Sequence, residues 1–547
     1  MKKNKSANKL KAIIVSGLLT VIILTAAGVI FYSLGKTDSF YLREITLNSS
    51  NGMTIQQYSE DFELLCSQIE ENIPMLYDHE ELYGISYEEI KKYYENAIKK
   101  ADTDYKYYSI VRSFFNNIPS RHLAAGFPLT SSIDSEFRKS FEENISFVSA
   151  QEYWFDVLHD ECQKYYDRAI NQMIFAYYSG EYRGIAKQTG HDVYSINKAA
   201  LLTVNNIPVD EFIKICPSVS KIKYDHINQK PMRDTLIFND SLGEECIIEY
   251  LDSAGKKHTM QAFYGFESDP VITYMDYFKR IDGVISADNS QTYPDSEDYI
   301  RTGSMRLKRN EQYDVLYAEI DSFDDAGANG EAMANAISLS SDGIGNIIID
   351  LRNNRGGFYE YALDVLGALS AESIEITKEI YVTEAFRQQF KDKRLYEFDT
   401  NTGLYKRSEK ETVMGTANEK KNIYLLISDT TASAADMLAY EFKQNDLGTV
   451  IGTNNTGGES YGMLCINYSD ISGIYYTYTG YSSYNPDSSV NSVYGTSPDI
   501  YLNTYVDNYF IRDKISEDGH DPYDWENRLK WDNPLSDTLK MIKENTP

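Results

Sequence analysis

The sequence predicts an α/β fold, because short apolar strands alternate with amphipathic helices over its second half. Residues 347–351 have the pattern of a strand buried on both faces, and residues 359–369 follow with helical spacing. Residues 423–427 form a second such strand, and a second helical pattern begins at Ser433. Strands and helices that alternate in this way imply parallel pairing with right-handed crossovers.

Ser433 lies where the second buried strand turns into a helix. A helix start offers unpaired backbone N–H groups and the positive end of the helix dipole. A serine nucleophile needs such donors for the oxyanion that forms after attack. Serine is also a common helix cap, so this stretch alone is compatible with either role.

A glycine-rich turn follows the first buried strand. It contains Asn353, Asn354 and the pair Gly356-Gly357. Two glycines allow a backbone to approach a ligand closely or to adopt positive φ. Taken alone, this is an ordinary strand-to-helix loop.

Four motifs stand in order along the chain. They comprise D-L-R-x-N-x-G-G from Asp350 to Gly357, T-x-S-A-x-D from Thr431 to Asp436, the set Ile451, Gly452, Thr456 and Gly458, and G-x-x-P-D-I from Gly495 to Ile500. Together they resemble the C-terminal processing (tail-specific) serine peptidase family, which also includes the tricorn core protease. The resemblance extends from about residue 55 to 505.

This resemblance implies a ClpP/crotonase-like α/β core preceded by an N-terminal helical segment and a degenerate PDZ-like domain. The PDZ carboxylate-binding loop is not recognisable, and residues 130–185 have an aromatic, helical pattern. The expected parts are 1–36 cytoplasmic lysines and transmembrane anchor, 37–129 N-terminal helical segment, 130–185 aromatic helical insertion, 186–270 PDZ-like domain, 271–505 peptidase core and 506–547 polar C-terminal tail with a short helix near 535–542.

Composition excludes several kinds of partner. The net charge of −29 argues against nucleic acid, because phosphate binding needs clustered Lys and Arg. The five cysteines form no C-x-x-C, and the seven histidines form no H-E-x-x-H, so we predict no metal and no cofactor. The sequence carries no signal for the oligomeric state.

The N-terminus predicts a membrane anchor. Five lysines within residues 2–11 precede an uncharged apolar run from Ala12 to Leu34, which at about 23 residues is long enough to span a bilayer. Lysines stay on the cytoplasmic side, so the rest of the chain is expected outside the cytoplasm as a single-pass protein of the cell membrane. The alternative is a cleaved signal peptide with a small-residue site at Thr25–Gly28.

The resemblance assigns His122 as the general base. It lies directly after the helical segment, where many family members read D-x-H-[ST], although Ser120 and Leu123 replace the usual neighbours. A lone structural histidine is the alternative. The family's Ser–Lys branch has its lysine where this chain has Glu459, so the Ser/His, tricorn-like branch is the nearer one.

The third catalytic residue of that branch is a Glu three residues before the last motif's glycine, a position held by Ser492 here. Glu459 is the other possible third member, since it follows the glycine turn in the family's lysine position. We expect the oxyanion donors to be the backbone N–H groups of Gly356 and Ala434. Glu459 also has a plain interpretation, a solvated turn carboxylate.

Two function classes follow. The first is a membrane-anchored extracellular serine peptidase that hydrolyses peptide or protein substrates with Ser433, activated by His122. The second is a catalytically inactive relative that binds peptide or envelope polymer as a scaffold or sensor. The retained Ser433, Gly356 and His122 favour the enzyme, whereas the missing Glu and PDZ loop favour the binder.

Overall fold

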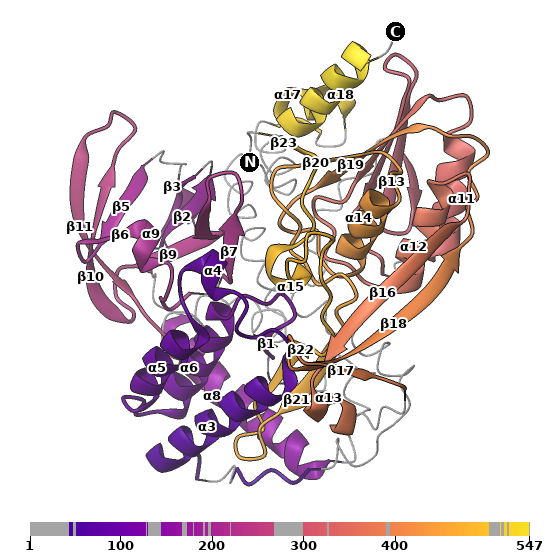
Figure 1. Cartoon of the computed structure of the whole chain (residues 1–547). Helices are drawn as coiled ribbons and strands as arrows, with labels where there is room; N and C mark the ends of the chain where they lie inside the picture. The colour runs from indigo at the N-terminus through magenta and orange to yellow at the C-terminus, as the bar shows by residue number, and fades with distance from the viewer. Residues whose placement is uncertain are drawn as a thin grey trace. The chain divides into compact units, whose positions relative to one another are not determined.

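The computed structural model divides the chain into two compact units (Figure 1). The first comprises Met1–Ser290, Thr383–Lys393 and Leu464–Thr479, and the second comprises the remaining three segments, Gln291–Val382, Arg394–Met463 and Gly480–Pro547. The structure describes residues 43–47, 51–126, 128, 144–166, 172–178, 180–189, 192–194, 199–218, 220–266, 299–324, 328–389, 394–502, 515, 519–521 and 524–545.

Helices open the first unit, within the N-terminal helical segment expected over residues 37–129. Thr54 and Ser86 each start a helix with a capping box, in which the hydroxyl and the N3 side chain satisfy otherwise unpaired N–H groups. The helices of this unit are α3 (Ile55–Asn72), α4 (Glu80–Tyr83), α5 (Tyr87–Ile98), α6 (Asp104–Asn117), α8 (Ile145–Tyr166), α9 (Val209–Phe212) and α13 (Glu384–Gln389).

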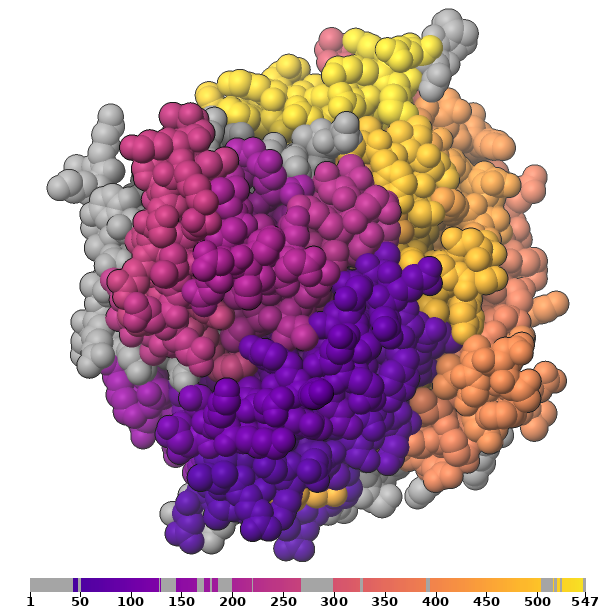
Figure 2. Space-filling view, turned by 60° about the vertical axis from the view of Figure 1, so that its left-hand side comes forward, coloured from indigo at the N-terminus to yellow at the C-terminus, as the bar shows by residue number. Residues whose placement is uncertain are grey.

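An eight-stranded sheet in the order β4-β3-β2-β9-β11-β10-β5-β6 follows the helices. Its strands are β2 (Gln172–Tyr178), β3 (Glu181–Thr189), β4 (Asp192–Tyr194), β5 (Ala200–Val204), β6 (Ile207–Pro208), β9 (Thr235–Asn239), β10 (Glu244–Leu251) and β11 (Lys257–Tyr264), and β7 (Ile222–Asp225) pairs separately with β8 (Lys230–Arg233). The indigo helices and the magenta strands lie side by side in both views (Figure 2). Tyr83 of α4 contacts the ring of Tyr224 on β7.

The predicted helical insertion over residues 130–185 is wrong from Gln172 onward. Helix α8 occupies part of that range, but β2 and the start of β3 are strands. Residues 174–177 are all buried, so β2 shows no alternation that would have marked it as a strand. The PDZ-like domain expected over 186–270 stays a prediction, and the sheet found there begins earlier.

A small antiparallel sheet completes the first unit. It has the order β1-β22-β21, with β1 at Ala124–Ala125, β21 at Leu464–Tyr468 and β22 at Tyr475–Thr479. Buried Asp61 of α3 holds the β21–β22 turn, accepting hydrogen bonds from the Ser469 hydroxyl and from Ser472 N at 3.1 Å. A hairpin that lies far along the chain is thereby joined to the N-terminal helices.

The second unit contains the predicted α/β core. Its seven-stranded sheet has the order β12-β13-β14-β15-β19-β20-β23, and the pairs from β14 to β23 are parallel, as expected. The strands are β12 (Ile300–Thr302), β13 (Met305–Asn310), β14 (Val315–Ile320), β15 (Asn346–Asp350), β19 (Asn422–Ile427), β20 (Thr449–Gly452) and β23 (Ile500–Tyr501).

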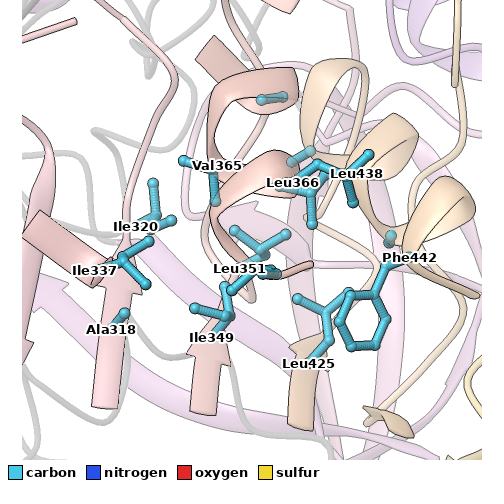
Figure 3. Packing of buried hydrophobic residues seen from close by; sticks show 14 of the residues in the cluster. Ala318, Ile320, Ile337, Ile349, Leu351, Val365, Leu366, Leu425, Leu438 and Phe442 are labelled. Carbon is cyan, nitrogen blue, oxygen red and sulfur yellow. The ribbon is translucent and has the colours of Figure 1, made fainter. Parts of the chain in front are cut away.

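Helices cover both faces of this sheet. One face packs on α11 (Gly330–Ser340), α12 (Tyr359–Ala368) and α14 (Ala434–Gln444), where alternate residues of β14, β15 and β19 point at the helices (Figure 3). The other face packs on α17 (Trp525–Trp531) and α18 (Asn533–Asn545), through Tyr317, Ile348 and Leu426. The predicted polar tail is therefore, over these residues, a structural layer.

A long hairpin projects from this core. Strands β16 (Ile374–Val382), β18 (Leu404–Val413) and β17 (Glu397–Asp399) form a separate antiparallel sheet. This hairpin lies within the range 271–505 that was expected to be the peptidase core. A short helix, α15 (Asn491–Tyr494), precedes β23.

The predicted transmembrane segment, Ala12 to Leu34, lies outside the described residues. Among the residues that the structure describes, no helix is both long enough and apolar enough to cross a bilayer.

A buried network of charges fastens α17 and α18 to the sheet. Asp532 forms a bidentate ion pair with Arg352, whose two Nη atoms donate to the carboxylate at 2.9 and 2.8 Å. Asp532 also pairs with Arg528. Arg352 in turn pairs with Asp350 at the end of β15, at 2.7 Å. Burial alone would raise the pKa of Asp532, but the charge of Arg352 outweighs this and holds the pKa below its usual value.

We predict that Asp532→Ala lowers the free energy of unfolding by about 3–5 kcal/mol, because it leaves two buried arginines short of a partner. Asp537→Ala is the matched control. That residue lies on α18 with an exposed lysine partner, Lys540, and its loss is expected to cost about 0–1 kcal/mol. Denaturant unfolding of both variants measures the difference, and equal midpoints would contradict the structural role of Asp532.

Candidate active site

Ser433 has a backbone conformation that non-glycine residues rarely adopt. Its φ is 55° and its ψ is −125°, immediately before helix α14. Its side chain makes no capping hydrogen bond, so the interpretation of Ser433 as a helix cap is not supported. Conformations of this kind cost about 1–3 kcal/mol and are concentrated at functional sites.

Backbone hydrogen bonds from two other loops hold Ser433 in this conformation. Ser433 N donates to the carbonyl of Gly458 at 3.0 Å, and Ala432 N donates to the carbonyl of Asn354 at 3.1 Å. The Ser433 carbonyl accepts from Met437 N at 2.8 Å, which starts the helix. The serine is thus clamped between the glycine loop and the loop after β20.

Side chains of the T-x-S-A motif region complete the clamp. The Thr431 hydroxyl donates to the carbonyl of Leu351 at 2.8 Å, and the Ser428 hydroxyl donates to the carbonyl of Arg352 at 2.5 Å. Gly457 N donates to the carbonyl of Thr431 at 2.6 Å. Three loops at the carboxyl ends of β15, β19 and β20 therefore form one hydrogen-bonded body.

Gly356 is packed directly against the serine. Its φ is 104°, and a Cβ added there would lie 2.7 Å from the Cβ of Ser433 and 3.0 Å from the N of Ala434. Only glycine fits this position, so the sequence motif has a steric reason. The glycine loop therefore lies close to the backbone N of Ala434, and a shared role of the two as oxyanion donors stays a prediction.

The N–H of Gly356 is engaged in this conformation. It donates to the side-chain oxygen of Asn354, two residues earlier, at 2.8 Å. Ala434 opens helix α14, and an N–H in a first helical turn has no intrahelical acceptor. The assignment of Gly356 as second oxyanion donor stays a prediction, and it requires Asn354 to share or release this N–H.

A buried carboxylate beneath the serine orders the loop after β20. Asp436 lies on α14 and accepts hydrogen bonds from the hydroxyls of Thr456 and of Ser460, the latter at 2.5 Å. Burial raises the pKa of Asp436, although these hydrogen bonds oppose the rise. Asp436 and Thr456 are recognisable in the sequence as motif residues, but the sequence does not show the hydrogen bond between them.

Glu459 and Ser492, the possible third members, both belong to the second unit. Glu459 is buried and has a φ of 72°, so its interpretation as a solvated turn carboxylate is wrong. The hydroxyl of Ser492 lies 3.1 Å from that of Ser482. Their catalytic roles remain predictions.

His122 belongs to the first unit and is buried. Its Nδ1 lies 3.1 Å from the hydroxyl oxygen of Thr479 on β22. Burial and the nearby charge of Lys221 lower the pKa of His122 to about 4. Sequence reasoning did not find Thr479, because no motif links residues so far apart.

The close packing of Gly356 on Ser433 generates a prediction. Gly356→Ala should lower the rate at which Ser433 reacts with a fluorophosphonate by a factor of about 10² to 10³, because the loop must move away from the reacting point. Gly403→Ala is the matched control, since Gly403 also has positive φ, at 72°, but nothing lies within 4 Å of the added Cβ. A normal labelling rate for Gly356→Ala would contradict the packing argument.

Comparisons with known proteins agree with this geometry. Residues 314–502 match the model of peptidase family S41. Mature CPAF in complex with lactacystin superposes with a TM-score of 0.50 at 14% identity, covering 90% of this chain and 99% of that one, which shows a shared fold.

Two further solved structures are similar at lower scores. The photosystem II D1 C-terminal processing protease has a TM-score of 0.34 at 12% identity, covering 81% of this chain and 93% of that one. A peptidase structure from Parabacteroides merdae has 0.34 at 14%, covering 45% and 67%. A search of curated proteins found no match. Residues 314–502 therefore form a peptidase S41 family domain, the domain of a serine-type peptidase.

Proposed function

We propose that the protein is a C-terminal processing serine peptidase that cleaves peptide bonds with Ser433 as nucleophile and His122 as general base. The observation that carries the proposal is the strained backbone of Ser433, held by two loops and packed against Gly356. Several hydrogen bonds maintain the strained backbone of Ser433, and the side chain makes no capping bond that would explain the strain. A rigidly presented hydroxyl at the first turn of a helix, where backbone N–H groups lack intrahelical acceptors, is an arrangement suited to acyl transfer.

In this proposal the hydroxyl of Ser433 attacks the substrate carbonyl while Nε2 of His122 takes the hydroxyl proton. The oxyanion is stabilised by the N–H of Ala434 and by that of Gly356 once Asn354 releases it. The imidazolium then gives its proton to the leaving amine, and water repeats the sequence on the acyl-enzyme. A lysine base has no place in this proposal, because Glu459 occupies the family's lysine position.

The low pKa of His122 supports a base that is neutral at physiological pH. A pKa of about 4 means that the imidazole loses its proton as the pH rises through about 4 and remains uncharged above it. Such a base is always ready to accept a proton but is weaker than an ordinary histidine. In the proposed enzyme the base is therefore weak, but it is uncharged over a wide pH range.

We also propose that the protein is anchored in the cell membrane by residues 12–34, with the peptidase outside the cytoplasm. The support is the lysine asymmetry around an apolar run. The substrate class is then a peptide or protein exposed on that side of the membrane.

The alternative, a relative that binds peptide without cleaving it, has one specific observation in its favour. The hydrogen bond from Gly356 N to Asn354 occupies one of the two expected oxyanion donors. The replacement of the usual Glu by Ser492 points the same way.

We predict that a fluorophosphonate labels the wild-type chain but not Ser433→Ala, and that His122→Ala is labelled slower by orders of magnitude. Glu459→Gln should lose less than His122→Ala. The wild-type rate should rise in one step near pH 4 and stay level through pH 6.5, because only the neutral imidazole accepts the proton.

The same lowered pKa makes folding oppose protonation, so stability falls as the pH drops from 6.5 toward 4. Initial rates with circular dichroism at each pH separate loss of the base from loss of the fold. Absent labelling of a folded wild-type protein would favour the non-cleaving alternative. A rate that climbs only in the lysine range would refute His122 as base.

The anchoring proposal predicts that a protease added to intact cells digests residues beyond the apolar run. A cytoplasmic protein in the same cells must survive, which controls for leakage. Protection of the chain until the membrane is permeabilised would place the peptidase inside and overturn this topology.

A further inference from the structure

The hydrogen bond between His122 and Thr479 follows from strand register. Strand β1 pairs antiparallel with β22, with Ala124 opposite Thr477 and Ala125 opposite Tyr476. His122 precedes β1 by two residues, and continuing the same register would bring it level with Thr479, the last residue of β22. The 3.1 Å contact of Nδ1 with the Thr479 hydroxyl agrees with this placement.

Both strands of this pair are fixed within the first unit. The Thr477 hydroxyl donates to the carbonyl of His122 itself. On β22, the ring of Tyr476 stacks on Phe115 of α6 at 5.1 Å. Lys221 donates to the carbonyls of Ser120 and Leu123, on either side of the histidine. The imidazole and the threonine are therefore held in place without help from a substrate.

The contact bears on which nitrogen of His122 carries the proton, because a threonine hydroxyl can accept from an Nδ1–H or donate to an unprotonated Nδ1. Within the described part of the chain the imidazole has this one hydrogen bond, at Nδ1, and Nε2 has none. A threonine oxygen can accept from an Nδ1–H and still donate its own proton elsewhere. The nitrogen that carries the proton is set by the hydrogen bond that it makes.

We propose that Thr479 is a positioning residue that holds His122 as the Nδ1–H tautomer, so that Nε2 carries the lone pair. The inference rests on the proposed peptidase function and adds a candidate third member to Glu459 and Ser492, whose catalytic roles remain predictions. A hydroxyl orients the ring as a carboxylate does, but it adds no negative charge. The only charge that acts on the buried ring within the described residues is that of Lys221, which opposes protonation.

This neutral arrangement differs chemically from a carboxylate–histidine pair. A carboxylate stabilises the imidazolium that forms during catalysis, whereas threonine leaves it uncompensated in a buried setting. In this proposal His122 accordingly stays uncharged over a wide pH range, and its protonation during catalysis is slow. Orientation and charge stabilisation, usually joined in one residue, are separated here.

The test reads the tautomer directly. Nitrogen-15 spectra of the full chain, labelled only at its seven histidines, identify the His122 signals by comparison with His122→Gln. At pH 7 the wild type should carry its proton on Nδ1. Thr479→Val, which keeps the shape and removes the acceptor, should shift the population toward Nε2–H and slow fluorophosphonate labelling about two- to tenfold.

Two variants separate positioning from mere support. Thr479→Ser restores a hydroxyl, so both the tautomer and the labelling rate should return to within about twofold of wild type. Thr477→Val removes the neighbouring hydroxyl on the same face of β22 and should leave the tautomer unchanged.

An Nε2–H tautomer in the wild type, or a tautomer unaffected by Thr479→Val, would overturn the proposal. The spectra decide this whether or not Ser433 is labelled, so failure of the peptidase function is recognised separately.

Discussion

The parallel register of β15 and β19 is the constraint on which the serine site depends. Asp350 stands opposite Leu426, so both strands end at the same edge of the sheet. The glycine loop and the serine turn therefore leave side by side and can exchange backbone hydrogen bonds. A slip of one residue would turn every side chain of a strand to the opposite face. The burial that stabilises the sheet thus also sets the distance between Gly356 and Ser433.

The buried charges behind this edge perform a different task. Arg352 follows β15 directly and is completely buried, where an unpaired guanidinium would be very costly. Asp350 and Asp532 neutralise it, one from its own strand and one from the junction of α17 and α18. Buried ion pairs of this kind contribute little net stability, because the cost of removing the charges from water offsets their attraction. Here they tie the last helices of the chain to the strand that carries the glycine loop.

Sequence reasoning succeeded where the physics is local. The buried strands around 347–351 and 423–427, the helices after them and the parallel pairing are all confirmed, because each has its own periodic signal. It failed where partners are distant or burial is two-sided. Residues 174–177 are buried on both faces and looked helical, and the polar tail hid Asp532, whose partner Arg352 lies 180 residues away.

The candidate site divides in the same way. Ser433 and Gly356 were recognisable from short motifs, and the structure packs them against each other, while their catalytic roles stay predictions. Two contacts of the site leave no pattern in the sequence. They are the hydrogen bond from Gly356 N to Asn354 and the contact of His122 with Thr479, and both form only when the chain is folded. Short motifs point to candidate residues, whereas the surroundings of those residues are a property of the fold.

The hairpin β21–β22 has a consequence for how the molecule comes into being. It belongs to the first unit although the chain on both sides of it, through Met463 and from Gly480, belongs to the second. The contact between His122 and Thr479 closes a loop of 357 residues. Contacts that close long loops form slowly, because the chain loses conformational entropy before the contact can stabilise it. During synthesis His122 meets Thr479 only after most of the polypeptide has been made, so a nascent or truncated chain carries the histidine without this contact.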